Sequence, residues 1–315
     1  MSNKGERALI SWIRRRKASF PSMVNIGLGD DLAGMRLGSE QLLFGCDQVL
    51  DGVHFKLSQC GPKAAGRKAL ARNLSDVAAM AALPLAAVAS VALPNDMPST
   101  QAQEIVSGMD ELAEQFSCPV VGGDIGSWSG PLAIDVSVLA TAAGLQPVRR
   151  NGAKPGDAIM VTGELGGAIL GKHLVFEPLV KQARALAEAV NLRAMIDISD
   201  GLAADLHHIA AESGCGARIL AERIPISSAA KELAKADSQE ALDHSLADGE
   251  DYELLFTLAG AETARARDIL SSLGARVSQI GQIIKEAVVL VDKDGNEQKL
   301  PAIGFEHFTQ RHKAD

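Results

Sequence analysis

The sequence predicts a two-domain α/β protein, and three observations lead to this class. The chain has 315 residues, which suits two domains because a globular domain averages about 150 residues. Segments typical of strands alternate with segments typical of helices in both halves. A run dense in turn-forming residues, 149–157, separates the halves. We therefore expect one α/β domain over residues 1–148 and a second over residues 149–315.

The first half contains apolar residues at helical spacing as well as short β-branched runs. Pro98 comes directly before one helical segment, and Ser99 or Thr100 is suited to cap it. Pro94 ends one of the strand-like runs. We expect helices over residues 4–16, 62–82 and 99–116, and strands over residues 41–46, 86–93, 119–121 and 132–143.

The second half repeats this mixture of strands and helices after the turn-rich segment. Its strand-like runs are short and apolar, and its helical segments again show apolar residues on one face. We expect strands over residues 158–162, 194–198, 218–220, 253–257 and 288–291, and helices over residues 179–190, 202–213 and 261–273.

The composition indicates a globular protein with a sizeable core. Hydrophobic residues make up 47% of the chain and charged residues 22%. Aromatic residues make up only 3%, so the core must be aliphatic and rich in alanine. The formal net charge is −8 and there is no basic block, which argues against a nucleic-acid ligand. An acidic protein that binds a polyphosphate needs metal ions between the two.

The sequence also indicates a cytoplasmic protein that does not enter a membrane. Its four cysteines form no CxxC pair, which is typical of reduced thiols. Residues 1–17 are polar and no apolar core follows them, so we expect no signal peptide. The apolar run 78–93 is short for a membrane span and is interrupted by Pro84, which favours a buried helix leading into a strand.

Acidic residues lie at the ends of apolar runs in several distant segments. Mg²⁺ is bound by a few carboxylates and completes its shell with water and substrate phosphates. A fold that brings these carboxylates together would form a Mg²⁺–phosphate site. The candidates are Asp30-Asp31, Asp47, Asp76, Gly122-Gly123-Asp124 and the segment 197–201, which contains Asp197, Ser199 and Asp200.

Two of these candidates carry the stronger signal, although each has a purely structural alternative. Asp76 lies in an apolar helical stretch, where a buried carboxylate is costly unless it is paired or hydrogen-bonded. The segment 197–201 ends a strand and opens a helix, where helix capping by Ser199 or Asp200 is the alternative. The remaining acidic segments are equally compatible with ordinary turns.

Further candidates are weaker when taken singly. Glu250 lies in the acidic segment 249–253, which is otherwise a charged entry into a strand. Arg150 is suited to pair with a phosphate, and His54 lies in a polar turn, but a surface arginine and a loop histidine are the alternatives. The sequence contains no GxxxxGK[ST] loop, no GxGxxG–acid signature and no protein-kinase motif set. These absences exclude the P-loop, Rossmann and protein-kinase classes.

Taken in order, these segments resemble the thiamine-monophosphate kinases, a family in the superfamily of aminoimidazole ribonucleotide synthetase. The matching segments span nearly the whole chain in the family's order, and those at 73–80 and 250–254 favour this family over its superfamily relatives. The matching segments are residues 27–31, 51–55, 73–80, 121–124, 150–157, 196–202 and 249–254.

The resemblance implies an N-terminal α/β domain that dimerises through its sheet and a C-terminal α/β domain that closes over it. It implies direct transfer of the γ-phosphoryl group of ATP to thiamine monophosphate, with Mg²⁺ as cofactor and a homodimer as the assembly. By position, it implies Mg²⁺ ligands at Asp31, Asp47, Asp76, Asp124, Asp197 and Asp200. It implies ATP contacts at Gly122, Gly123, Arg150 and Ser199, and substrate contacts at His54, Glu250 and Phe305. The expected catalytic residues are Asp76, Asp124, Asp200 and Arg150.

The chain departs from the family's pattern at four places: before Asp47, after Gly163, over residues 172–178, and at Asp248, where the family has glycine. Where the family commonly has hydroxyl residues before Asp47, this chain has Gly45 and Cys46, and a thiol is a poor ligand for a hard cation. The segment after Gly163 is shorter than in the family. Two alternatives remain open: another ATP-dependent enzyme of the superfamily with a different small substrate, and a non-catalytic protein that binds a nucleotide or thiamine phosphate.

Overall fold

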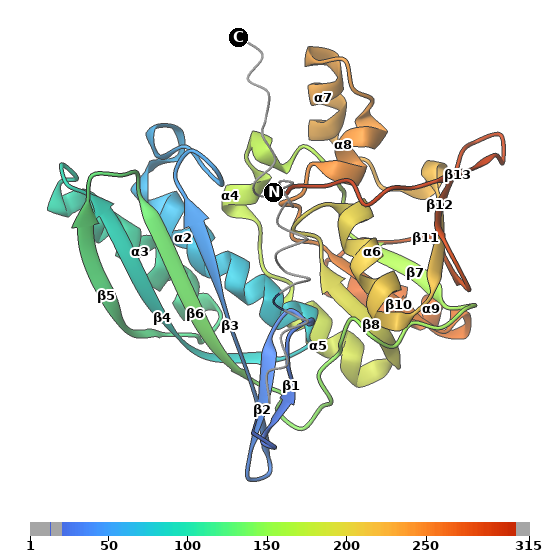
Figure 1. The fold of residues 1–315 in the computed structure, drawn as a ribbon, viewed down its shortest axis with the longest axis horizontal. Helices are drawn as coiled ribbons and strands as arrows, with labels where there is room; N and C mark the ends of the chain where they lie inside the picture. Colours follow the sequence, from blue (N-terminus) through green and yellow to red (C-terminus); the bar gives the residue numbers. More distant parts are fainter. Residues whose placement is uncertain (1–12, 14–20, 307–315) are drawn as a thin grey trace.

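The computed structural model describes residue 13 and residues 21–306 of the chain. The helix expected over residues 4–16 lies, apart from Ile13, outside the described residues. Within them, the chain forms two β-sheets with packed helices, which confirms the predicted α/β class (Figure 1). The first sheet and its helices come from the N-terminal half, and the second sheet with its helices comes from the C-terminal half.

The first sheet has six strands in the order β1-β2-β3-β6-β4-β5. Its strands are β1 (Val24–Ile26), β2 (Ala33–Leu37), β3 (Glu40–Leu50), β4 (Leu83–Pro94), β5 (Val120–Trp128) and β6 (Ala133–Thr141). All neighbouring strands are antiparallel except β4 and β5, which are parallel. The edge strand β5 extends well beyond the short strand expected over residues 119–121. Its glycine-rich sequence gives little signal for a strand. The segment is extended because it pairs with β4.

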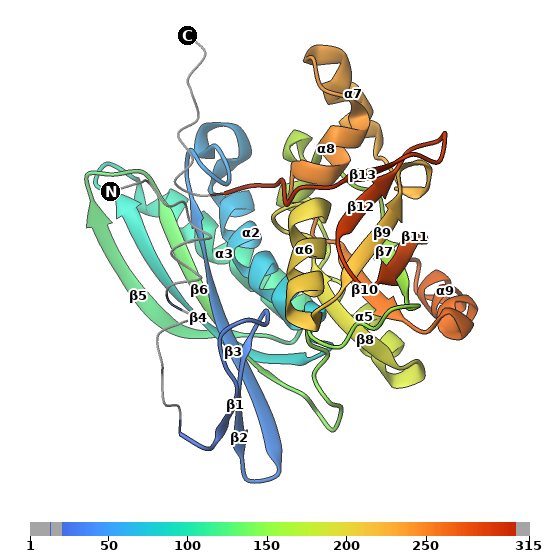
Figure 2. The same cartoon turned by 45° about the vertical axis from the view of Figure 1, so that its right-hand side comes forward.

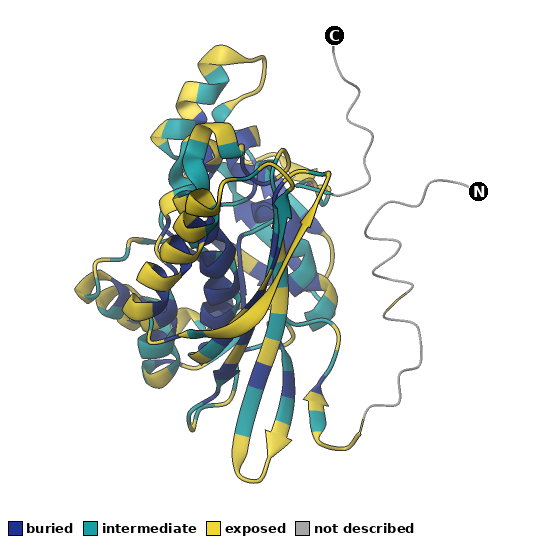
Figure 3. Ribbon diagram, turned by 90° about the vertical axis from the view of Figure 1, so that its left-hand side faces the viewer, coloured by how far each residue is buried: buried dark blue, intermediate teal, exposed yellow. Residues whose placement is uncertain are grey.

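One face of the first sheet is covered by helices and the other face is open. Side chains alternate along a strand, so Val136 and Val138 on β6 are buried while Leu139 is exposed. The buried side packs against α2 (Leu57–Ala79) and α3 (Ser99–Gln115). Figure 3 shows the open side as a broad exposed and half-exposed surface. Phe44, Val88 and Leu139 lie exposed on it.

Helix α2 starts earlier than the helix expected over residues 62–82. The chain turns at Gly61, whose φ of 77° interrupts the helix, and the residues before this kink form a helical turn of their own. Nearly the whole inward face of α2 is buried, because the helix lies between the first sheet and elements of the second half (Figure 2). It contacts α4 (Lys172–Val175), α5 (Val180–Ala189) and β8 (Leu192–Asp197).

The second sheet has seven strands in the order β13-β12-β9-β11-β7-β10-β8. Consecutive residues of β7 (Ala158–Thr162) face opposite helical layers, with Met160 packed toward α5 and Ile159 toward α6. The sheet is therefore covered on both faces. The other strands are β9 (Gly216–Leu220), β10 (Leu254–Leu258), β11 (Val277–Ile284), β12 (Val288–Val291) and β13 (Glu297–Lys299), and the other helices are α6 (Leu202–Ser213), α7 (Ser228–Ala236), α8 (Ala241–Ala247) and α9 (Thr263–Ser272).

The predicted elements of the second half occur within a few residues of their expected bounds. Helix α6 and strand β12 have the expected bounds. Helices α4, α7 and α8 and strands β11 and β13 were not expected, because short elements with mixed faces give little periodic signal. In the described part of the chain, no helix is both long and apolar enough to span a lipid bilayer.

Candidate active site

A cavity of about 660 Å³ lies between the two halves and brings together most of the predicted site residues. It is bordered by the ends of β3 and β8, the C-terminal part of α2, and the loops that follow β8 and α8. The predicted residues that line it are Asp31, Asp47, His54, Asp76, Arg150, Asp197, Ser199, Asp200, Glu250 and Phe305.

Three carboxylates from three separate elements meet in this cavity. Asp31 follows β1, Asp76 lies on α2, and Asp197 ends β8, and their carboxylate oxygens lie within 4.8 Å of one another. The Ser75 hydroxyl donates a hydrogen bond of 2.6 Å to Asp197 Oδ2. Oxygen donors gathered in this way fit a hard divalent cation, because such cations prefer carboxylate ligands.

The electrostatics of this three-carboxylate group also favour a cation. Burial and the nearby charge of Asp31 raise the pKa of Asp197 to about 7, although Ser75 and Arg150 oppose the shift. Burial and the charges of Asp47 and Asp197 raise the pKa of Asp76 well above its usual value. A divalent cation would reverse both shifts, because it stabilises the ionised form of each carboxylate.

Two arginines after the first sheet bind the adjacent aspartates at residues 30 and 31. Arg150 donates from Nη2 to Asp31 Oδ1 at 2.8 Å and from Nε to Asp31 Oδ2 at 3.3 Å, a bidentate pair. Arg149 donates from Nε to Asp30 Oδ2 at 2.6 Å. Of the two pairs, only the one formed by Arg150 and Asp31 lines the cavity. The structure therefore places a fixed cation beside the three-carboxylate group.

Asp47 lies on β3 and is paired with a residue that the sequence analysis did not name. Arg72 on α2 donates from Nε to Asp47 Oδ2 at 3.1 Å and from Nη1 to the Gln48 carbonyl at 3.2 Å. Burial lowers the pKa of the Arg72 guanidinium, but the pKa is raised overall because Tyr252, Asp47 and Glu250 lie close to it. Asp47 thus borders the cavity and is already paired with the positively charged guanidinium of Arg72.

Two loops of the second half fix each other at the rim of the cavity. The Glu250 N–H donates to the Ser199 carbonyl at 2.8 Å, and the Tyr252 N–H donates to the Ile198 carbonyl at 2.9 Å. Glu250 and Tyr252 both have left-handed backbone conformations, with φ of 56° and 51°. Such conformations are uncommon for residues other than glycine and persist only where the surroundings hold them, often at functional sites.

Glu250 is held in its ionised form by two buried residues that the sequence analysis missed. Lys68 Nζ lies 2.8 Å from both carboxylate oxygens, and His173 Nδ1 lies 3.1 Å from Oε2. Burial alone would raise the pKa of Glu250, but His173 and Lys68 outweigh it and lower the pKa to about 2. Lys68 could have been recognised from the sequence, because a charged side chain inside an apolar helical run is costly unless it is paired. The same reasoning identified Asp76.

His54 and Phe305 approach each other across the same cavity. Their ring centroids are 6.1 Å apart. The Leu50 N–H donates to His54 Nδ1 at 3.0 Å, which fixes the orientation of the imidazole. The Phe305 N–H donates to the Asp200 carbonyl at 2.9 Å, which ties this late segment to the acidic loop after β8.

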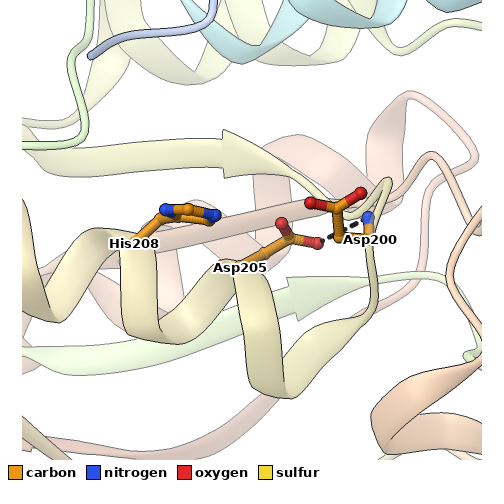
Figure 4. A group of neighbouring side chains, drawn as sticks. All are labelled: Asp200, Asp205 and His208. Carbon is orange, nitrogen blue, oxygen red and sulfur yellow. Dashed lines mark hydrogen bonds between the residues drawn. The ribbon is translucent and has the colours of Figure 1, made fainter. Parts of the chain in front are cut away.

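Asp200 belongs to a second acidic group at the start of α6, drawn in Figure 4 with Asp205 and His208. The Asp205 carboxylate accepts hydrogen bonds from the N–H groups of Asp200 at 3.2 Å and Gly201 at 3.1 Å. Burial and the charge of Asp200 raise the pKa of Asp205 well above its usual value. Asp205 therefore holds the loop that carries Ser199 and Asp200, a role the sequence analysis did not assign.

Gly122, Gly123 and Asp124 lie apart from the cavity, on the exposed edge strand β5. Gly123 has a structural reason to be glycine, because an added Cβ would come within 1.8 Å of the Ala89 carbonyl oxygen. Gly122 has no such constraint. Asp124 shares the open face of the sheet with Ser90, its register partner on β4. The ATP and Mg²⁺ roles expected for these three residues remain predictions.

Comparison with known proteins identifies relatives over most of the chain. The family described as AIR synthase related protein, N-terminal domain, matches residues 29–145, and its C-terminal domain matches residues 154–293. The thiamine-monophosphate kinase of Rhodopirellula baltica is 38% identical over 287 residues, which cover 89% of this chain and 89% of that protein. That of Escherichia coli K12 is 32% identical over 327 aligned residues, covering 96% and 98%.

A solved structure agrees with these sequence matches. The structure described as AaThiL complexed with AMPPCP and TMP has a TM-score of 0.81 and 30% identity, and covers 96% of this chain and 97% of that one. The fold and the carboxylate-lined cavity thus define an AIR-synthase-related protein. More narrowly, the chain belongs to the thiamine-monophosphate kinase family, a family of enzymes, which confirms the resemblance drawn from its motifs.

Proposed function

We propose that the protein transfers the γ-phosphoryl group of ATP to thiamine monophosphate in a Mg²⁺-dependent reaction. The observation that carries this proposal is the three-carboxylate group beside the Arg150 guanidinium, in a cavity that also holds a separate set of polar and aromatic side chains. The related structure with AMPPCP and TMP supports both substrates. The products would be ADP and thiamine diphosphate.

The three-carboxylate group of Asp31, Asp76 and Asp197 would hold Mg²⁺, because it supplies oxygen donors that are otherwise costly to keep ionised. Bound there, Mg²⁺ would offset the charge of the ATP phosphates. Arg150 and the loop that carries Ser199 and Asp200 lie next to this group and would position the triphosphate. A planar guanidinium suits this task because it can donate two parallel hydrogen bonds to phosphate oxygens.

The acceptor phosphate would enter from the side of His54, Glu250 and Phe305, which face the same cavity. An oxygen of thiamine monophosphate attacks the γ-phosphorus, the bond to the β,γ-bridging oxygen breaks, and ADP leaves with that oxygen. The attacking oxygen is already ionised at neutral pH, so the site needs no strong base. Catalysis then consists of positioning and of offsetting the repulsion between two polyanions. The transfer is direct, without a phosphoenzyme.

We also propose that two chains pair through the open face of the first sheet. The exposed apolar side chains of Phe44, Val88 and Leu139 lie on three neighbouring strands of this face. Contiguous exposed apolar surface of this kind marks interaction sites in soluble proteins. A second copy of the chain would cover the surface from which Asp124 also projects.

The deciding experiment is formation of thiamine diphosphate from ATP and thiamine monophosphate, followed with Mg²⁺ and with excess chelator. The proposal expects product only with the metal. Metal-dependent binding of ATP without product would favour the two alternatives, an enzyme with a different small substrate or a binding protein. Product that forms equally well in chelator would contradict the role given to the three-carboxylate group.

A further inference from the structure

Arg72 is the cationic side chain in the cavity that neither the sequence motifs nor the proposed reaction explains. It comes from α2 one helical turn before Asp76, and its side chain is only 16% exposed. Hydrogen bonds from Nε and Nη1 fix the guanidinium to Asp47 and to the backbone of Gln48. These two hydrogen bonds fix the position of the guanidinium, which is planar and always protonated, so its positive charge has a defined place in the cavity.

Asp47 differs in its surroundings from the three carboxylates that meet nearby. The group that could share one cation consists of Asp31, Asp76 and Asp197, without Asp47. The residues that precede Asp47 add no oxygen donor from their side chains, since they are Gly45 and Cys46. Strand alternation also directs the Cys46 side chain to the face opposite Asp47. A hard cation at Asp47 would therefore gain no ligand from positions 45 and 46 and would meet the positive charge of Arg72.

We propose that Arg72 is a built-in cation that takes the place of a metal ion at Asp47 and binds phosphate oxygens there. Mg²⁺ would then be confined to the three-carboxylate group. The position suits this role, because Arg72 lines the cavity together with Asp76, Glu250 and Tyr252. The guanidinium thus shares the cavity with one member of the three-carboxylate group and with Glu250 of the proposed acceptor side. This inference deepens the proposed kinase function and uses the same cavity.

The test counts metal ions in the full chain with Mn²⁺ alone as the probe, by titration with free Mn²⁺ read from its electron paramagnetic resonance signal. Arg72→Gln is expected to bind one more Mn²⁺ per chain than the wild type, because Asp47 loses its competing cation. Arg72→Lys retains a positive charge and is expected to bind no additional ion. An unchanged count in a folded Arg72→Gln variant would overturn the proposal.

A matched control and an independent variant complete the test. Arg218→Gln breaks the surface ion pair with Glu297, whose Nε–Oε1 distance is 2.6 Å, and is expected to gain no Mn²⁺. Asp47→Asn answers the question even if Arg72→Gln does not fold. The proposal expects its Mn²⁺ count to equal that of the wild type, and loss of one ion would overturn it. Neither measurement uses nucleotide or turnover, so failure of the kinase reaction would be recognised separately.

Discussion

At the scale of single residues, burial decides what each carboxylate of the cavity can do. Asp197 is buried and Asp76 is half-buried among other acids, and removal from solvent raises the pKa of each. Glu250 is half-buried, but its contact with His173 and its ion pair with Lys68 lower its pKa. The first two are therefore suited to receive a metal ion, whereas Glu250 already has its cation and is suited to recognise a ligand.

Asp76→Asn is expected to keep the fold and to lower kcat by about a hundredfold or more, because it would remove a proposed Mg²⁺ ligand. In the absence of metal the variant should be at least as stable as the wild type, since an amide carries no buried charge. Steady-state kinetics and thermal unfolding measure the two effects. Asp110→Asn on the exposed side of α3 is the control. Turnover close to that of the wild type would remove Asp76 from the mechanism.

The buried acids also predict a pH dependence of stability. Asp197 has a folded pKa of about 7, above the value near 4 expected for an unfolded chain, so the folded state binds its proton more tightly. Without metal, the free energy of unfolding should therefore fall as the pH rises from about 4 to about 7. Saturating Mg²⁺ should remove this decline, because it stabilises the ionised acids. Denaturant titrations at several pH values test this, with Asp197→Asn as the variant expected to show a smaller decline. A free energy of unfolding that rises over this range without metal would contradict the assignment.

At the scale of elements, α2 and two short loops organise the site. One helix supplies Lys68, Arg72 and Asp76, because residues four apart lie on the same face of a helix. The loops after β8 and α8 exchange backbone hydrogen bonds, so the acidic residues on one are positioned by the other. The left-handed residues of the second loop are held by these bonds.

Gly249→Ala tests this contact between loops. Gly249 has a φ of 73°, and an added Cβ would lie 2.6 Å from the Ser199 carbonyl oxygen. Gly274→Ala is the matched control, because its φ of 75° is similar and nothing lies within 4 Å of the added Cβ. Both variants should lower the free energy of unfolding by about 1–2 kcal/mol, because alanine is strained in a left-handed backbone conformation. Only Gly249→Ala should lose further stability and also weaken nucleotide binding. Equal melting temperatures and equal nucleotide affinity would show that the loops do not depend on this contact.

At the scale of the whole molecule, the two sheets differ in exposure, and this difference underlies the proposed pairing of two chains. The second sheet is covered on both faces, whereas the first leaves one face open. Val88→Asp would place a charge in the middle of that open face. It should convert a dimer into a monomer in sedimentation velocity, because burying an unpaired carboxylate in an interface is costly.

Val106→Asp, on the exposed side of α3, is the control for this assembly. It changes an equally exposed valine on the other side of the domain and should leave the dimer intact. A wild-type chain that sediments as a monomer at micromolar concentration would contradict pairing through the open face.

Much of the fold and part of the site were predictable from local patterns. The helix at α6 and the strand at β12 follow from periodicity, and Asp76 was recognisable because a carboxylate interrupted an apolar helical run. The length of strand β5 was underestimated because its glycines are also typical of turns, although Gly123 allows the strand to approach β4 closely. His173 and Asp205 were missed because their environment depends on segments far away in the sequence.

The sequence by itself determined the α/β class, the family, and the residue types that metal–phosphate chemistry requires, because periodicity and motifs are local properties of a chain. Only the tertiary structure decided which charges meet. In the folded chain, one group contains the carboxylates of Asp31, Asp76 and Asp197. Asp47 forms an ion pair with Arg72, and Asp124 lies on the open face of the first sheet. Electrostatic energy depends on the distances and burial of charges after folding, and sequence separation does not specify either quantity.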